Sequence, residues 1–120
     1  MSEIISFDFD NTLARISVQT FALKVKQIGY PICITTSRYE KHPYFDNQDL
    51  YTVADKLGIK NIFFTNMNWK FKFIAEKNFF MHFDDDEEEI SKIEAFTKCH
   101  AIHVIRYNWM NNAMKILLNN

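Results

Sequence analysis

The stretch Ile4-Ile5-Ser6-Phe7-Asp8-Phe9-Asp10-Asn11-Thr12-Leu13 decides the fold of this chain. It begins with a short apolar run, which is typical of a buried strand. If the backbone stays extended beyond that run, Asp8 and Asp10 project to one side and Phe9 turns toward the core. Two carboxylates that lie this close repel each other, so one is protonated or a cation lies between them. An acidic turn that merely closes a strand would use the same residues, so the rest of the chain has to decide.

Four more apolar runs follow, and they alternate with longer segments of helical periodicity. The predicted strands cover residues 4–7, 32–35, 61–64, 79–83 and 101–105. The predicted helices cover residues 18–28, 49–57, 69–77, 86–96 and 110–118. Strands that alternate with helices are typical of a parallel sheet covered on both faces. We therefore predict an α/β fold, a three-layer Rossmann-like parallel five-stranded sheet, as a single domain over residues 1–120.

Composition excludes several classes of function. The 120 residues are 48% hydrophobic, which is too apolar for a disordered chain. The formal net charge of -1 argues against a polybasic nucleic-acid clamp. With only two glycines, the chain has neither a glycine-rich dinucleotide loop nor a glycine-rich phosphate loop. Any phosphate chemistry must therefore use carboxylates, a metal, a lysine or a helix N-terminus.

The cysteines and the N-terminal segment indicate a compartment. Cys33 and Cys99 lack the spacing of a zinc site and lie in apolar runs, so we expect buried free thiols in a reducing compartment. The first residues lack the basic segment of a secretory signal, and no apolar stretch reaches the ~18 residues of a membrane span. The expectation is a soluble, cytoplasmic protein without a membrane partner.

Polar side chains follow two of the predicted strands. The carboxyl ends of parallel strands share one edge of a sheet, and ligands bind there. Thr36 and Ser37 follow the second strand, where hydroxyl and N–H groups suit phosphate oxygens, although they also suit helix capping. Asp84 and Asp85 follow the fourth strand, and clustered carboxylates at that place suit Mg²⁺.

Two lysines, Lys70 and Lys72, lie near the start of the helix predicted over residues 69–77. A lone lysine at such a place is usually solvated. The order of the elements is more specific than any one of them: an acidic pair, a hydroxyl, a lysine and a second acidic pair follow one another along the chain. This order predicts that the residues converge on one cation at one rim of the sheet.

At these positions the chain resembles the haloacid dehalogenase superfamily of phosphotransferases, over roughly residues 3–95. FDFDNTL at 7–13 looks like the first motif of that family, and ITTSR at 34–38 looks like the second. Lys70 looks like the lysine of the third motif, with Lys72 as the second choice, and HFDDD at 82–86 looks like the fourth. The segments that hold a cap domain in the family are short here. The chain therefore looks like a capless member, with a HAD-like sheet and an open site.

The resemblance implies a Mg²⁺-dependent phosphomonoester hydrolase that works through an aspartyl-phosphate. It implies that Asp8 is the nucleophile and Asp10 the general acid–base. The implied metal site uses Asp8, Asp84 and the backbone carbonyl of Asp10, with Asp85 orienting metal-bound waters. The implied phosphate contacts are Thr36, the N–H of Ser37 and Lys70.

The sequence leaves several classes of substrate and partner open. The expected partner is a phosphorylated substrate: a nucleotide, a sugar phosphate, a phosphoprotein or a nucleic acid, the last only as a phosphate-bearing end because the net charge is near zero. Arg38 and Lys41 are candidate substrate contacts. The helix predicted over 110–118 forms either the last layer of the core or a surface for an oligomer. We predict that His82, inside a strand, is a core histidine.

Two other functions have to be weighed against hydrolysis. A response-regulator receiver places its acceptor aspartate after the third strand and its lysine after the fifth, and neither residue is at those places here. A domain that binds a phosphorylated ligand without turning it over stays open. Asp10 favours turnover, because pure binding gains little from a second carboxylate beside the nucleophile.

Overall fold

The computed structural model describes residues 3–120 and has an α/β fold built on a five-stranded sheet in the order β3-β2-β1-β4-β5. Every neighbouring pair of strands is parallel, as predicted. The strands are β1 (Ile5–Phe7), β2 (Ile32–Thr36), β3 (Ile62–Phe64), β4 (Met81–Asp84) and β5 (His100–His103). The chain builds outward from β1 to β3 and then returns to β4 on the other side of β1. This reversal creates a switch point between β1 and β4, where ligands bind in sheets of this kind.

Five α-helices connect the strands or follow them, close to the predicted ranges. They are α1 (Ile16–Gln27), α2 (Gln48–Leu57), α3 (Lys70–Lys77), α4 (Glu87–Phe96) and α5 (Trp109–Leu118). The fourth strand begins two residues later than predicted, because Asn78 ends α3 in the left-handed conformation and the Phe79 N–H still donates to the carbonyl of Ile74. Phe79 therefore belongs to the end of the helix rather than to the strand.

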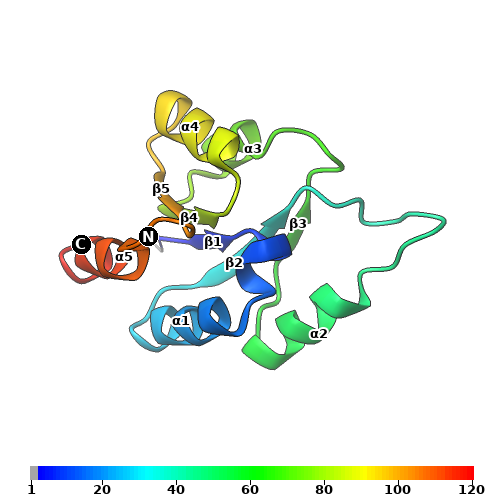
Figure 1. Cartoon of the computed structure of the whole chain (residues 1–120), viewed down its shortest axis with the longest axis horizontal. Helices are drawn as coiled ribbons and strands as arrows, with labels where there is room; N and C mark the ends of the chain where they lie inside the picture. The colour runs from blue at the N-terminus through cyan, green and yellow to red at the C-terminus, as the bar shows by residue number, and fades with distance from the viewer. Residues whose placement is uncertain (1–2) are drawn as a thin grey trace.

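The helices form two layers, one on each face of the sheet (Figure 1). Helices α1, α2 and α5 pack on one face over the side chains of Ile5, Phe7 and Phe83, and the rings of Phe7 and Phe83 stack with centroids 4.5 Å apart. Helices α3 and α4 pack on the other face. Burying one Phe or Ile side chain fully stabilises the folded state by ~1.5–3 kcal/mol, so the two apolar clusters stabilise the three-layer arrangement.

The C-terminal helix contributes to the core. Trp109, Ala113 and Leu117 of α5 are buried in the larger apolar cluster, and the Trp109 ring packs edge-to-face with Phe21 and Phe83. Of the two predicted roles of this helix, the structure therefore shows the core layer. Its use as a surface for an oligomer stays a prediction.

The α3–α4 face of the sheet is partly polar at its centre. Alternation along the strands turns Ser6, Thr35 and His82 to this face, and all three are fully buried. Cys33 lies on the same face, and both it and Cys99 are buried free thiols, as predicted. Among residues 3–120, no helix has the length and apolarity that crossing a membrane requires.

Candidate active site

Asp8 is the first residue after β1 and lies at the switch point of the sheet. Its N–H donates to the carbonyl of Phe83 in β4, at 2.9 Å. The chain then turns through η1 (Phe9–Leu13), a π-helical turn in which Asn11 has a φ of 57°, a conformation that asparagine tolerates. The turn brings Thr12 back, so that its hydroxyl donates to Asp8 Oδ2 at 3.0 Å. The local backbone therefore fixes the direction of the Asp8 carboxylate.

Three carboxylates from distant parts of the chain meet at this point. Asp8, Asp84 and Asp85 each offer an oxygen, and these oxygens lie within 4.8 Å of one another. The register of the sheet explains this, because Phe7 pairs with Phe83 and the residues that follow them, Asp8 and Asp84, are therefore neighbours. Asp8 and Asp84 are buried, and Asp85 is half-buried. Hard oxygen donors in this number suit Mg²⁺, so the predicted convergence of these residues is present.

Lys70, and not Lys72, completes the cluster. Lys70 is the first residue of α3, and its buried Nζ donates to Asp8 Oδ1 at 2.7 Å and to Asp84 Oδ2 at 2.8 Å. Lys72 is exposed. The backbone N–H of Lys70 donates to Glu89 Oε2 of α4 at 2.9 Å, so Glu89 anchors the start of α3. The sequence analysis missed Glu89, which lies in the first turn of α4.

The cluster has more negative than positive charge. Burial raises the pKa of Asp8 well above its ordinary range, Lys70 opposes this shift, and the nearby Asp84 adds to it. Burial would lower the pKa of Lys70, but the two carboxylates outweigh burial and raise it. Burial also raises the pKa of Asp84, yet hydrogen bonds from His82 and Lys70 more than reverse this and hold it well below its usual value. A divalent cation would offset the burial that disfavours the charged form of Asp8, so it fits the electrostatics as well as the donor set.

His82, which the sequence analysis assigned only to the core, also contacts Asp84. Its Nε2 lies 2.8 Å from Asp84 Oδ2, and its Nδ1 lies 2.9 Å from Ser6 Oγ. Burial lowers the pKa of His82, so the ring is neutral. The carboxylate can only accept, so Nε2 donates to Asp84, and Nδ1 accepts from Ser6. Ser6 in turn lies 2.7 Å from Thr35 Oγ1, so a buried row of hydrogen bonds runs from β2 to the cluster.

A signal for this role is present in the sequence. His82 and Asp84 are two residues apart in a strand, so their side chains leave the same face of the sheet. Ser6 was placed in the first strand, but the register that brings it to His82 depends on tertiary pairing, with Ser6 opposite His82.

Replacing His82 with leucine should destabilise the protein by roughly 1–3 kcal/mol, because a buried carboxylate and a buried hydroxyl each lose a partner. Urea unfolding followed by circular dichroism measures this change. His100→Gln is the matched control, since His100 is exposed at the start of β5, and it should stay close to the wild-type free energy of unfolding. Equal stabilities for His82→Leu and His100→Gln would show that the row does not support Asp84.

Asp10 pairs with Arg38 and is not among the three carboxylates that meet at the switch point. The strand ends at Phe7, and the η1 turn directs the Asp10 carboxylate to Arg38, whose Nε and Nη2 donate to it at 2.9 and 2.7 Å. The same guanidinium binds Asp49, at 2.8 and 2.9 Å. These two carboxylates raise the pKa of Arg38, Asp49 contributing most, so it stays charged. Arg38 thus supplies the positive charge beside the Asp10 carboxylate.

The hydroxyl residues lie at the end of β2, as predicted. Thr36 is fully buried, and its Oγ1 accepts from the N–H of Arg38 at 3.2 Å, which leaves the hydroxyl proton free to be donated to a ligand. Ser37 is half-buried at the same edge, and its carbonyl accepts from Met67 N–H at 2.6 Å. That bond ties the end of β2 to the loop after β3.

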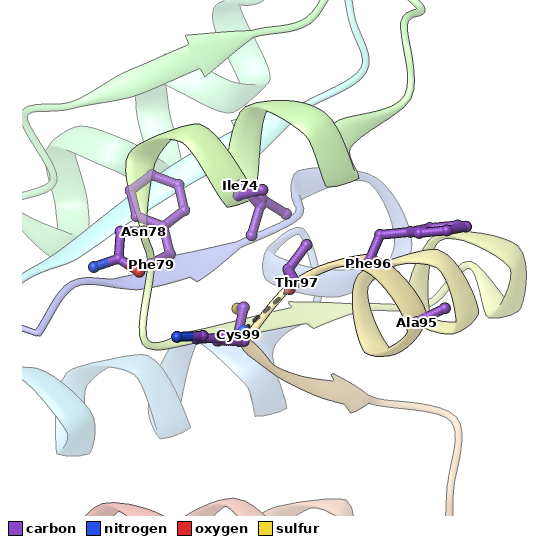
Figure 2. Close-up of a pocket in the computed structure, with 9 residues that line it drawn as sticks. Ile74, Asn78, Phe79, Ala95, Phe96, Thr97 and Cys99 are labelled. Atoms are coloured by element: carbon purple, nitrogen blue, oxygen red, sulfur yellow. Dashed lines mark hydrogen bonds between the residues drawn. The ribbon is translucent and has the colours of Figure 1, made fainter.

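A hollow at the opposite edge of the sheet lacks this chemistry (Figure 2). It has a volume of about 490 Å³ between the ends of α3 and α4, and none of its lining residues is acidic. The N–H of Cys99 donates to Thr97 Oγ1 at 3.0 Å, the dashed line in Figure 2, and burial raises the pKa of the Cys99 thiol to about 12. A thiol held protonated in this way is a poor nucleophile.

The acidic cluster at the β1–β4 switch point is therefore the candidate active site. Comparison with protein-family models and with curated proteins finds no match for this chain, so membership of the family that its motifs resemble stays a prediction.

Proposed function

We propose that the protein is a Mg²⁺-dependent phosphomonoester hydrolase that works through a phosphorylated aspartate, on a HAD-like capless domain. The observation that supports this most strongly is the meeting of Asp8, Asp84 and Asp85 with Lys70 at the switch point of the sheet. A nucleophile, an acidic cation site and a fixed positive charge are the parts that phosphoryl transfer needs.

In the proposed reaction an oxygen of Asp8 attacks the phosphorus in line. The bond to the ester oxygen breaks, its electron pair stays on that oxygen, and Asp10 supplies a proton to the leaving alcohol. Asp10 then removes a proton from a water that attacks the phosphorus, and the Asp8 oxygen leaves as a carboxylate. Splitting the hydrolysis into two transfers lowers each barrier.

The residues present fit a divalent cation. Mg²⁺ bound by Asp8 and Asp84, with the carbonyl of Asp10 as the implied further ligand, supplies positive charge that lets a carboxylate approach a phosphate. Lys70 has three donors and uses two on Asp8 and Asp84, so one remains for a phosphate oxygen. The Thr36 hydroxyl and the N–H of Ser37 are the other proposed phosphate contacts.

Binding of a phosphorylated ligand without turnover is the second candidate, and the pairing of Asp10 with Arg38 favours it. A carboxylate that accepts two donors from a guanidinium is not free to protonate a leaving group. Hydrolysis requires Asp10 to exchange at least one of these contacts for the leaving oxygen. Its side chain is 52% exposed, so the exchange needs no opening of the core.

The proposal is tested by phosphate release from a panel of phosphomonoesters with Mg²⁺ and with a chelator. Asp85→Asn should raise the Mg²⁺ concentration for half-maximal activity by ~10–100-fold, because it disturbs the groups that orient the ion. Glu88→Gln, an exposed carboxylate on α4, is the matched control and should leave that concentration unchanged. Equal activity with and without the chelator would contradict the proposal.

A further inference from the structure

A second concave surface lies beside Asp10, on the same edge of the sheet. It has a volume of about 570 Å³ and is formed by the loop after β2, the start of α2 and the loop after β3. Its walls include the rings of Tyr39, His42 and Phe45, with Met67 from the loop after β3. Cavities of this volume are of the size that small organic ligands occupy.

The aromatic walls are held in place by the backbone around them. The ring of His42 lies 5.9 Å from that of Tyr39 and 4.9 Å from that of Phe45, centroid to centroid. Asn47 is buried, and its Nδ2 donates to the carbonyls of Tyr39 and Glu40 at 3.0 and 3.2 Å. Asn47 Oδ1 accepts from Arg38 at 3.3 Å, so the Asn47 side chain joins the end of the loop after β2 to its beginning. The three rings therefore form one surface rather than three separate exposed side chains.

Arg38 joins this pocket to the proposed reaction. It lines the pocket, and its guanidinium binds Asp10 on one side and Asp49, another lining residue, on the other. The leaving oxygen of a substrate lies at Asp10 in the proposed reaction. Because Arg38 contacts Asp10 and also lines the pocket, the organic group attached to that oxygen lies next to the aromatic walls.

The lining chemistry selects a class of organic group. Tyr39 and Phe45 are 45% and 73% exposed, so aromatic faces are open to stack on a flat ring. The hydrogen bonds from Arg38 lower the pKa of Asp49, which therefore stays a carboxylate and accepts N–H donors. Asp46 also lines the pocket, and its carboxylate disfavours further phosphate groups there. A substrate with a flat ring, N–H donors on that ring and a single phosphate is a mononucleotide, and the flat ring is its base.

We propose that this pocket binds the nucleobase of a nucleoside 5′-monophosphate whose phosphate is hydrolysed at Asp8. The assignment of the substrate rests on the proposed function, but the binding of the base does not.

The test compares a nucleoside 5′-monophosphate with glycerol 3-phosphate, which has no ring. In Phe45→Ala the ratio of their kcat/KM values should fall about tenfold or more, mainly through KM for the nucleotide, as expected when one stacking partner is lost. Tyr107→Ala is the matched control, since Tyr107 is 97% exposed in the loop after β5, the strand farthest from β3 in the sheet, and it should keep the wild-type ratio. An unchanged ratio in Phe45→Ala, with both substrates hydrolysed, would overturn the pocket and leave the hydrolase standing.

Two further results separate the claims. If the wild type hydrolyses neither substrate, equilibrium dialysis with a labelled nucleoside 5′-monophosphate and Mg²⁺ decides: binding that weakens about tenfold in Phe45→Ala supports the pocket without the hydrolase. Absent binding, or binding equal in both proteins, overturns the pocket as well. A higher kcat/KM for a 5′-phosphorylated oligonucleotide than for the mononucleotide would overturn the assignment to mononucleotides.

Discussion

Asp8→Asn should reduce Mg²⁺-dependent phosphate release from an aryl phosphate to the rate of a protein-free solution. The amide has no anionic oxygen to attack phosphorus, so the first transfer is lost rather than slowed. The fold should persist, because the amide oxygen still accepts from Lys70, and burial already disfavours the charged form of Asp8. Circular dichroism and urea unfolding verify the fold, and a phosphate assay measures the loss.

The matched control for this variant is Asp55→Asn, an exposed carboxylate on α2. It should retain full activity. Turnover retained in Asp8→Asn would remove Asp8 as the nucleophile, whatever the effect of the other substitutions.

Asp10→Asn should lower kcat by ~10²–10⁴-fold, the usual contribution of general acid–base catalysis. The introduced amide keeps an oxygen that accepts from Arg38, and the site is exposed, so folding should be unaffected. Steady-state kinetics with glycerol 3-phosphate isolates this effect from any contact with an aromatic leaving group.

Asp49→Asn separates proton transfer from pairing, because Asp49 is the other carboxylate bound to Arg38. Asp49→Asn should lower kcat far less than Asp10→Asn does on the same substrate. A loss below about threefold in Asp10→Asn would show that Asp10 is not the acid–base, and would favour the ligand-binding function, since enzymatic proton transfer contributes ~10²-fold or more.

Much of the fold follows from local pattern. Buried strands in a parallel sheet are continuous apolar runs, so β1 and β2 were found with nearly correct bounds. The helix predicted over residues 49–57 ends where α2 ends, because Gly58 follows it with a φ of 69°. The site residues at strand ends were also predictable, because a parallel sheet brings the carboxyl ends of its strands to one edge. Asp8 and Asp84 meet for that reason, and Lys70 contacts them from the start of α3.

The parts that sequence did not reveal depend on pairing between distant segments. Arg38 is 28 residues from Asp10, and the η1 turn that directs Asp10 toward it is not a regular strand, since Asn11 adopts a φ of 57°. His82 meets Ser6 across 76 residues, through the register of β1 with β4. The aromatic pocket depends on the hydrogen bonds of Asn47 within the loop after β2, and no periodic pattern in the sequence predicts these bonds.

The most direct test of the account is an acid quench of the Asp10→Asn variant during turnover of an aryl phosphate with Mg²⁺, followed by peptide mass spectrometry. Without Asp10 as the base, hydrolysis of the acyl phosphate slows and the phosphorylated protein accumulates. We predict the mass of one phosphoryl group on the peptide that contains Asp8. A phosphoryl group on a different residue, or turnover with no phosphorylated peptide, would contradict the account.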